Sequence, residues 1–518
     1  MKLPFPSPDG RKIALYCFGK QSEIQRYKWL EPLYIFDMES ESTTLIADDL
    51  VSGGTLRHEP AWSSDSANLA YIHNQRLNIV NVSTLEVTEV EVKGEKLDDR
   101  FLLWSPKGNQ LMAKNKAKAG SLILVNDMET IKIEIPPGKK LRGIMRRSDD
   151  YWYWSPDGQS CVLWVCDNET GDHGFLKLNL ESRCFFELNH EPAAYYAAPF
   201  ASIAGQMSDI SADGTKVIYG KEGINSPLEL WCTNKRFDSF KQVTTINKNI
   251  KTLRTHSCRL IKWFDLKENL RGGVLLLPEK REAQGYPLVV VIYPGISTTA
   301  AVHSWDYETL SAVLPPQVLL DNDLAVFIPE IFPNKKSLAK DITQELLFAV
   351  RAVMEHAPIN KSKMAILGQS MGGYAVNTVV TNTAVFKSAI SVSGFGNLSS
   401  HYGMFYEHDG EIDGYGCQGL ETGQIGIGAP WECPLDYVNN SPLYFLDCVQ
   451  TPLLLLGGSE DPIYQPEEML VGLERLGKKV ECYRYKGEGH VPAEWSLENR
   501  KDAADRIVRW IKKHFEHM

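Results

Sequence analysis

The sequence of 518 residues lacks the long apolar runs that mark a membrane protein. Its apolar stretches, such as 288–293 and 453–456, are far shorter than the roughly 20 residues that span a bilayer. Residues 1–6 lack the apolar core of a signal peptide. We therefore expect a soluble, cytoplasmic protein that makes no membrane contact.

Clustered cysteine and positive charge are also scarce. The ten cysteines are scattered without any Cys-x-x-Cys pair, so we expect reduced thiols and neither a zinc site nor a disulfide framework. No other metal or cofactor is indicated. Lys and Arg number 55 against 65 Asp and Glu, which gives a net charge of −10. Without a basic stripe to neutralise phosphates, a nucleic-acid partner is not expected.

What remains is the composition of an ordinary globular protein, with 43% hydrophobic and 23% charged residues. At about 150 residues per domain, the length allows about two to four domains. Composition therefore leaves a multidomain enzyme or a scaffold as the open possibilities.

A short turn motif recurs five times in the N-terminal half, each time followed by an alternating apolar segment. The copies are Ser7-Pro8-Asp9-Gly10, Trp62-Ser63-Ser64-Asp65, Trp104-Ser105-Pro106-Lys107-Gly108, Trp154-Ser155-Pro156-Asp157-Gly158 and Ile210-Ser211-Ala212-Asp213-Gly214. Their serines are 56, 42, 50 and 56 residues apart. Proline presets φ, Asp caps through its side chain and Gly accepts positive φ, so the motif predicts a tight turn between strands.

A second alternating pair of apolar segments follows each turn, so each repeat holds four expected strands. Four strands in about 50 residues is the pattern of a β-propeller blade. We predict an all-β propeller of about five blades over residues 1–258, and a degenerate sixth blade stays open. The alternative, unrelated hairpins in a β-sandwich, accounts less well for the regular spacing.

From about residue 260 the pattern changes to β-branched strands that alternate with amphipathic helices. The expected strands are 273–277, 288–293, 325–328, 364–367, 388–392, 453–456 and 480–485. The expected helices are 338–356, 371–382, 466–476 and 501–515. This alternation predicts a mostly parallel sheet covered on both faces, in a second domain over residues 259–518.

Between an expected strand and helix of this domain lies Gly368-Gln369-Ser370-Met371-Gly372. It fits G-x-S-x-G, the nucleophile elbow of an α/β-hydrolase, in which a sharp turn exposes the serine Oγ above the sheet. In this context Ser370 is the predicted nucleophile, and the alternative is an ordinary loop serine. The second domain is therefore predicted to be an α/β-hydrolase.

A serine nucleophile needs a base and a carboxylate, which follow in the order Ser, Asp or Glu, His in this fold. Asp461 comes directly after the buried segment 453–456, and we prefer it to Glu460 and Asp447. His490 lies in a Gly-rich loop after the last expected strand, 29 residues beyond Asp461. The predicted triad is Ser370, Asp461 and His490.

An oxyanion hole needs two hydrogen-bond donors. The backbone N–H of Met371, the residue after the nucleophile, is one candidate. Pro294 has no N–H, so the hydroxyl of Tyr293 is the better second donor than a backbone group. A tyrosine that only packs at the end of a strand is the alternative.

The sequence resembles the prolyl oligopeptidase family of serine peptidases at several points. These are the blade motifs, the elbow with Tyr374, Asn440-Ser441-Pro442, Thr451-Pro452 and residues 485–490. The resemblance covers essentially the whole chain. It implies that Tyr293 supplies an oxyanion hydroxyl, as in the prolyl oligopeptidase and dipeptidyl peptidase branches. The acylaminoacyl-peptidase branch, which reads His-Gly-Gly-Pro at that point, matches less well.

The resemblance also implies that the segment after 388–392 lines the pocket for the side chain before the scissile bond. Phe395, Leu398 and Tyr374 are the candidates there, with Trp431 from the Gly-rich and aromatic stretch 401–434. Core packing is the alternative for Phe395. The sequence departs from the family's pattern in two ways that bear on substrate specificity. Propellers of the family usually have seven or eight blades, whereas about five are expected here. The paired glutamates with which dipeptidyl peptidases hold a free amino terminus are not found, since Glu191 and Glu222 are isolated.

These features predict a serine hydrolase that cleaves short peptides through an acyl-enzyme. An esterase, or a transferase acting on a small acyl substrate, would use the same triad. A non-catalytic propeller interaction protein is the less favoured alternative. Substrate preference, exo or endo cleavage and oligomeric state cannot be read from the sequence.

Overall fold

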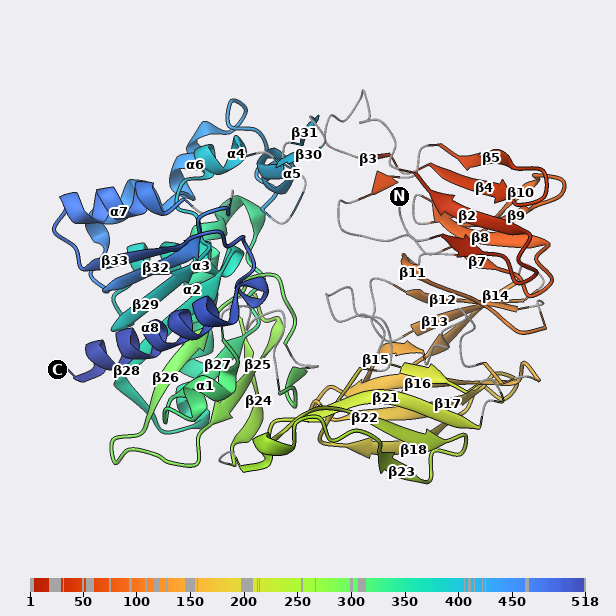
Figure 1. The fold of residues 1–518 in the computed structure, drawn as a ribbon, viewed down its shortest axis with the longest axis horizontal. Coiled ribbons are helices and arrows are strands. Elements are labelled where there is room, and N and C mark those ends of the chain that lie inside the picture. The colour runs from red at the N-terminus through yellow and green to blue at the C-terminus, as the bar shows by residue number, and fades with distance from the viewer. Residues whose placement is uncertain are drawn as a thin grey trace.

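The structure is a computed structural model that describes residues 4–516 with gaps. The gaps are 18–28, 31, 49–50, 53–59, 74–75, 93–95, 108–109, 116–120, 127–128, 145–153, 156, 197–207, 212, 214, 253–254, 266, 299–300, 306–313, 405, 409–410, 414, 422, 424 and 462–464. Within the described residues, an N-terminal series of antiparallel sheets precedes one large mixed sheet. The chain is therefore a β-propeller followed by an α/β-hydrolase domain (Figure 1).

Five antiparallel sheets follow one another along an arc in chain order (Figure 1). The first contains β1 (Phe5–Pro6), β2 (Lys12–Tyr16), β4 (Leu33–Asp37) and β5 (Ser42–Ala47). The second contains β7 (Ala61–Trp62), β8 (Asn68–His73), β9 (Arg76–Asn81) and β10 (Val87–Val90), and the third β11 (Leu97–Trp104), β12 (Gln110–Asn115), β13 (Ser121–Asn126) and β14 (Glu129–Glu134). The fourth contains β15 (Lys139–Ile144), β16 (Ser160–Asp167), β17 (His173–Asn179) and β18 (Phe185–Glu191).

The fifth sheet differs by one extra strand. It contains β19 (Ala194–Tyr196), β20 (Ser208–Ile210), β21 (Lys216–Gly223), β22 (Ser226–Asn234) and β23 (Phe240–Gln242), with β20 paired to β21. A separate short pair joins β3 (Trp29–Leu30) to β6 (Val51–Ser52). The sequence prediction of about five blades is confirmed.

The five repeated turns are closed in the same way. In each, the serine hydroxyl accepts the backbone N–H of the residue five positions later, at 2.8–3.3 Å, in the copies at Ser7, Ser63, Ser105, Ser155 and Ser211. Side chains also link successive sheets, because Trp62 Nε1 donates to Phe5 O and Trp104 Nε1 donates to Ala61 O, both at 2.9 Å. The repeated motif therefore closes each turn, and in the second and third copies its tryptophan also joins one blade to the one before it.

The C-terminal domain is built on an eight-stranded sheet in the order β24-β25-β27-β26-β28-β29-β32-β33. Its strands are β24 (Ser257–Phe264), β25 (Leu270–Leu277), β26 (Tyr286–Val291), β27 (Ala325–Pro329), β28 (Ile359–Gln369), β29 (Ser388–Val392), β32 (Leu453–Gly458) and β33 (Val480–Tyr485). The β24–β25 and β25–β27 pairs are antiparallel, and the others are parallel. The predicted mostly parallel sheet is confirmed.

Helices cover both faces of this sheet. They are α1 (Pro316–Leu320), α2 (Leu338–His356), α3 (Met371–Asn382), α4 (Leu398–Tyr402), α5 (Tyr415–Glu421), α6 (Pro434–Asn439), α7 (Pro466–Arg475) and α8 (Leu497–Glu516). Short 3₁₀ turns are η1 (Lys248–Thr252), η3 (Lys335–Ser337), η4 (Pro442–Cys448) and η5 (Pro492–Glu494), and β30 (Tyr406–His408) pairs with β31 (Glu411–Asp413). Among the described residues, no helix combines the length and the apolar character that a membrane crossing needs.

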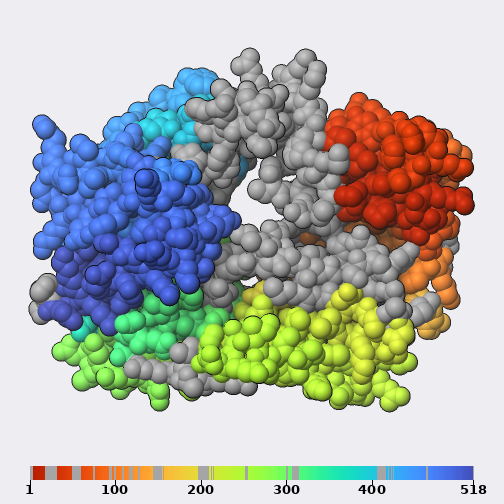
Figure 2. All heavy atoms as spheres, viewed as in Figure 1, coloured from red at the N-terminus to blue at the C-terminus, as the bar shows by residue number. Residues whose placement is uncertain are grey.

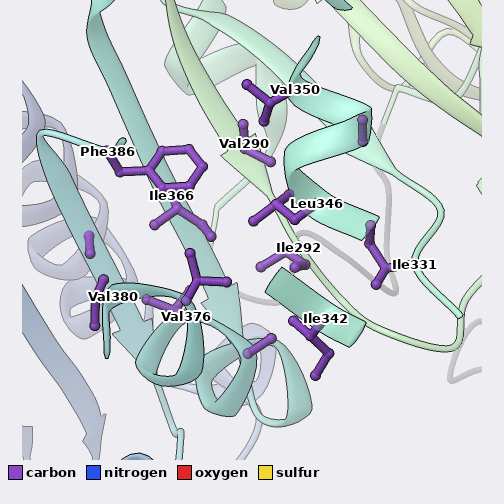
Figure 3. Packing of buried hydrophobic residues seen from close by; sticks show 14 of the residues in the cluster. Val290, Ile292, Ile331, Ile342, Leu346, Val350, Ile366, Val376, Val380 and Phe386 are labelled. Atoms are coloured by element: carbon purple, nitrogen blue, oxygen red, sulfur yellow. The ribbon is translucent and has the colours of Figure 1, made fainter. Parts of the chain in front are cut away.

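The core of this domain is divided by the sheet into two layers. Along β26, Leu288 and Val290 belong to one buried cluster and Val289 and Val291 to the other, because successive strand side chains point to opposite faces. Figure 3 shows the first cluster, in which Ile342, Leu346 and Val350 of α2 and Val376 and Val380 of α3 pack on the sheet. The second cluster is closed by α1 and α8. This packing holds the carboxyl ends of the central strands, where the candidate site lies.

Candidate active site

Ser370 stands at a sharp turn between β28 and α3. Its backbone has φ 57° and ψ −118°, a left-handed conformation that is strained for a residue with a Cβ. The Ser370 N–H donates to Val392 O of the neighbouring strand β29 at 2.8 Å. The surrounding sheet therefore holds the strained turn in place, as expected of a nucleophile elbow.

The glycines around Ser370 are required by close backbone contacts. A Cβ on Gly372 would lie 2.2 Å from Ile292 O, and a Cβ on Gly368 would lie 2.3 Å from Gly372 O. A Cβ on Gly373 would lie 2.7 Å from Gly394 Cα. The elbow can pack against the strands only because these positions carry no side chain.

The structure brings Ser370, His490 and Asp461 together. His490 Nε2 lies 2.9 Å from Ser370 Oγ, and His490 Nδ1 lies 3.0 and 2.9 Å from Oδ1 and Oδ2 of Asp461. The Asp461 side chain is fully buried, whereas the His490 side chain is 20% exposed. With Asp461 ionised, Nδ1–H donates to the carboxylate, which leaves Nε2 as the acceptor for the serine hydroxyl.

The loop that carries His490 is fixed by its neighbours. Gln369 Nε2 donates to His490 O at 3.1 Å, and Trp495 Nε1 donates to Gly489 O at 2.9 Å. The backbone N–H of Glu460 donates to Glu488 O at 3.0 Å, which joins this loop to the one that carries Asp461. Both loops are thereby held at the elbow.

The alternatives that the sequence left open lie elsewhere. Glu460 is exposed beside Asp461, and Asp447 is exposed on η4. His514 hydrogen-bonds through Nδ1 to Trp510 O within α8. His517 falls outside the described residues. Within the described part of the chain, Asp461 and His490 are the residues that hydrogen-bond in series with Ser370.

The two candidate oxyanion donors flank the elbow. Met371 begins α3, and the first N–H groups of an α-helix have no acceptor within the helix. Tyr293 lies two residues after the end of β26. Its ring lies beside the elbow, since a Cβ on Gly372 would be 3.5 Å from Tyr293 Cδ2. The half-buried Tyr293 ring also packs against both core clusters.

Three predicted substrate-binding residues are buried in the core instead. Tyr374 and Leu398 have no exposed surface and Phe395 is 3% exposed. The Phe395 ring stacks on Tyr374 at 4.9 Å and on His401 at 4.1 Å between ring centroids. Packing covers nearly all of the surface of these three side chains, and their contact with substrate stays a prediction. Trp431 is 71% exposed and meets Tyr402 edge-on at 5.5 Å.

The sequence reasoning missed His401, a 5% exposed histidine of α4. Burial, and secondarily the nearby His490, lower the pKa of His401 to about 4. The only signal in the sequence was a histidine three residues after Leu398, on the segment already assigned to the pocket. In the described residues, no group of three or more His, Cys, Asp or Glu side chains is arranged to hold a metal ion.

Comparison with known proteins agrees with this geometry. Residues 333–518 match the model of the prolyl oligopeptidase family. This similarity to the family covers the C-terminal part of the chain. The matched region begins before α2 and includes Ser370, Asp461 and His490, so the similarity lies in the part of the hydrolase domain that carries them.

Similar peptidases are also found by sequence and by structure. An uncharacterised peptidase of Bacillus subtilis (strain 168), YuxL, is 25% identical over 366 residues, which is 65% of this chain and 49% of that protein. The chain therefore spans about half the length of this curated relative.

Solved structures share the fold. A puromycin-hydrolysing peptidase of Mycobacterium tuberculosis has a TM-score of 0.72 at 14% identity, over 99% of this chain and 79% of its own. An acylaminoacyl peptidase of Pyrococcus horikoshii has a TM-score of 0.51 at 16% identity, over 98% of this chain and 95% of its own. At such low identity these similarities establish the two-part fold and nothing finer.

Proposed function

We propose that this chain is a serine hydrolase that cleaves peptide bonds of short peptides through an acyl-enzyme on Ser370. The observation that carries the proposal is the series of hydrogen bonds from buried Asp461 through His490 to Ser370, set on a strained elbow. The match of residues 333–518 to the model of the prolyl oligopeptidase family supports the same chemistry. The names of two structural relatives, a puromycin-hydrolysing peptidase and an acylaminoacyl peptidase, support an amide substrate.

In the first half of the reaction, His490 Nε2 takes the hydroxyl proton as Ser370 Oγ attacks the scissile carbonyl carbon. Asp461 keeps Nδ1 protonated, orients the ring and stabilises the imidazolium that forms. The carbon–nitrogen bond then breaks, and the leaving amine receives the proton from His490. In the second half, His490 activates a water molecule, which releases the acid and returns the proton to Ser370 Oγ.

The negative charge on the tetrahedral oxygen needs donors that are already in place. The proposed donors are the Met371 N–H, at the first turn of α3, and the Tyr293 hydroxyl. The helix N-terminus adds a favourable electrostatic contribution at the same point. Rigid packing of Tyr293 beside Gly372 supports its assignment, because a fixed donor costs little reorganisation during the reaction.

The test is hydrolysis of a library of short peptides by the purified chain and by Ser370→Ala. The account predicts that Ser370→Ala lowers kcat at least about 10⁴-fold with an unchanged fold. Ser182→Ala, in an exposed turn of the fourth propeller sheet, is the matched control and should leave kcat unchanged. Retention of activity by Ser370→Ala would exclude the proposal.

An esterase or an acyl transferase would use the same triad, so the products must be identified. Mass spectrometry of reactions with peptide amides, aryl esters and an added amine distinguishes the three outcomes. Free acid from peptide amides supports the peptidase. Turnover of esters alone, or products joined to the added amine, would replace it with the esterase or the transferase.

A further inference from the structure

Gln369 is the last residue of β28 and directly precedes the proposed nucleophile. Successive side chains of a strand point to opposite faces of a sheet, so Gln369 points to the same face as Leu367, toward the cluster closed by α1 and α8. Tyr485 and Trp495 belong to that cluster and flank the loop that carries His490. The side chain at position 369 therefore lies on the side of the sheet that this loop covers.

The Gln369 side chain is bound to this loop. The residue is 8% exposed, and its Nε2 donates to His490 O at 3.1 Å. A buried amide is costly without a hydrogen bond, so the buried side chain needs this contact. The elbow pattern G-x-S-x-G requires neither a size nor a polarity at this position. An apolar side chain would satisfy the elbow equally well, so the glutamine needs another explanation.

Three further hydrogen bonds join this loop to the one that carries the proposed acid. The backbone N–H of Ser459 donates to Tyr485 O at 2.9 Å, and the Gly487 N–H donates to Ser459 Oγ at 2.8 Å. The Glu460 N–H donates to Glu488 O at 3.0 Å. The proposed acid and base therefore stand on two loops that are joined to each other along their length.

The connection of the base loop to the elbow is narrower. Within the part of the chain that the structure describes, two hydrogen bonds join residues 486–491 to the elbow. His490 Nε2 lies 2.9 Å from Ser370 Oγ, and Gln369 Nε2 donates to His490 O. The first bond cannot persist through the proposed reaction, because Ser370 Oγ has no proton once it carries the acyl group. Gln369 then provides the hydrogen bond that still joins the elbow to His490.

We propose that Gln369 is a positioning residue that holds His490 over the acyl-enzyme during its hydrolysis. In that step the water oxygen bonds to the acyl carbon and a water proton passes to His490 Nε2. The bond from the acyl carbon to Ser370 Oγ then breaks, and the proton passes to Oγ. Gln369 acts on this step through the His490 carbonyl, which it keeps at the elbow.

The inference rests on the proposed function and concerns the second half of that reaction. In the first half, the hydrogen bond between Ser370 and His490 itself keeps the two residues aligned. Loss of the Gln369 donor should therefore slow deacylation more than acylation. A distorted or partly unfolded site would slow both steps together, so this asymmetry separates positioning from a merely structural role.

The experiment follows the reaction of nitrophenyl acetate with the wild-type chain and with Gln369→Met, since methionine has nearly the shape of glutamine but no N–H donor. The initial burst of nitrophenol measures acylation, and the decay of the acetylated chain, followed by mass spectrometry, measures deacylation. In Gln369→Met we expect deacylation to slow at least about 10-fold and acylation by less than about 3-fold. The acetyl group should accumulate on Ser370.

A second variant and a control accompany this measurement. At neutral pH the carboxylate of Gln369→Glu donates no hydrogen bond and repels the His490 carbonyl, so deacylation should slow at least as much as in Gln369→Met. Gln450→Met is the same substitution at an exposed position after η4, and it should change neither rate. The rate at which a fluorophosphonate labels Ser370 reports in each variant whether the elbow is intact.

Equal deacylation rates in the wild-type chain and in Gln369→Met would overturn the inference, and so would a loss of the same factor in acylation and deacylation. If Gln369→Met takes no fluorophosphonate, Gln369→Glu decides by the same two rates. If neither variant is labelled, Gln369 shapes the elbow itself and the inference is wrong. A wild-type chain in which neither reagent modifies Ser370 would overturn the proposed function, and this inference with it.

Discussion

The two ring nitrogens of His490 face different partners, and this division is the central chemical feature of the site. Nδ1 faces the buried carboxylate of Asp461, and Nε2 faces Ser370 Oγ. In the proposed mechanism Asp461 fixes the tautomer, so its charge decides whether Nε2 can accept the serine proton.

We therefore expect Asp461→Asn to lower kcat by about 10³ to 10⁴-fold, since an amide can hold the wrong tautomer. Steady-state kinetics on a cleaved peptide is the measurement. Asp447→Asn, at the exposed competitor on η4, should leave kcat unchanged. A kcat for Asp461→Asn equal to that of the unmodified chain would remove Asp461 from the mechanism.

His401 gives a stability prediction with a defined sign. Its pKa is about 4 in the folded chain and ordinarily 6.5, so protonation favours the unfolded state. The stability that neutral His401 contributes is complete above pH 6.5 and is lost as the pH falls toward 4. Between these values, the free energy of unfolding should fall by up to about 3 kcal/mol more in the unmodified chain than in His401→Phe. Urea titrations at several pH values measure the free energy of unfolding of both chains. The same pH dependence in the unmodified chain and in His401→Phe would contradict the prediction.

At the residue scale, the sequence alone could point to the proposed triad because each member has a local signature. Ser370 lies in a fixed pentapeptide, while Asp461 and His490 each follow a strand in a fixed chain order. The direction of a loop side chain has no such signature. Phe395 follows a strand end and could face substrate or core, and its stacking with Tyr374 and His401 is visible only in three dimensions.

At the scale of elements, the elbow can form only because glycines stand where its backbone packs closely against neighbouring backbone. In Gly372→Ala the added Cβ would meet Ile292 O at 2.2 Å, and backbone atoms cannot move aside easily. We expect this variant to lose most of its activity and to unfold at a lower temperature, by several degrees. Gly419→Ala on α5, where a Cβ meets nothing within 4 Å, is the control. Thermal unfolding followed by circular dichroism, together with peptide hydrolysis, tests this prediction. A Gly372→Ala chain as stable and active as the control would contradict it.

The bounds of helices and strands were predicted best where the hydrophobic pattern in the sequence is long and local. The bounds predicted for α2 and α3 are those of the structure, since both are apolar-periodic over many residues. The antiparallel edge strand β24 was missed. Among the described strands, β24 pairs with β25 alone, and its residues alternate like those of a propeller strand. Its place in the eight-stranded sheet therefore depends on a pairing that the local sequence pattern does not reveal.

At the scale of the whole molecule, the last propeller sheets meet the hydrolase domain through specific contacts. In Figure 2 the yellow-green surface of the propeller adjoins the green start of the hydrolase domain. Asp172 of the fourth sheet lies 2.7 Å from His303 Nε2, and Glu169 pairs with Lys262 of β24 at 2.5 Å. The Trp305 N–H donates to Glu222 of β21 at 3.0 Å.

Of these contacts, the Asp172–His303 pair is largely buried, so its removal should loosen the junction by about 1–3 kcal/mol. Asp172→Ala should therefore speed hydrogen exchange in residues 169–173 and 301–305 without affecting the distant first sheet. Glu181→Ala, an exposed acidic residue of the same sheet, is the control. Exchange rates equal to those of the control would show that this pair does not join the domains.

The assignment of Ser370 as the nucleophile is the claim on which the proposed function depends. The most direct test treats the full chain with a fluorophosphonate and identifies the modified residue by peptide mass spectrometry. The account predicts a single label on Ser370, which is lost in Ser370→Ala and slowed in Asp461→Asn. A label on another residue, or a folded chain that takes no label, would contradict it.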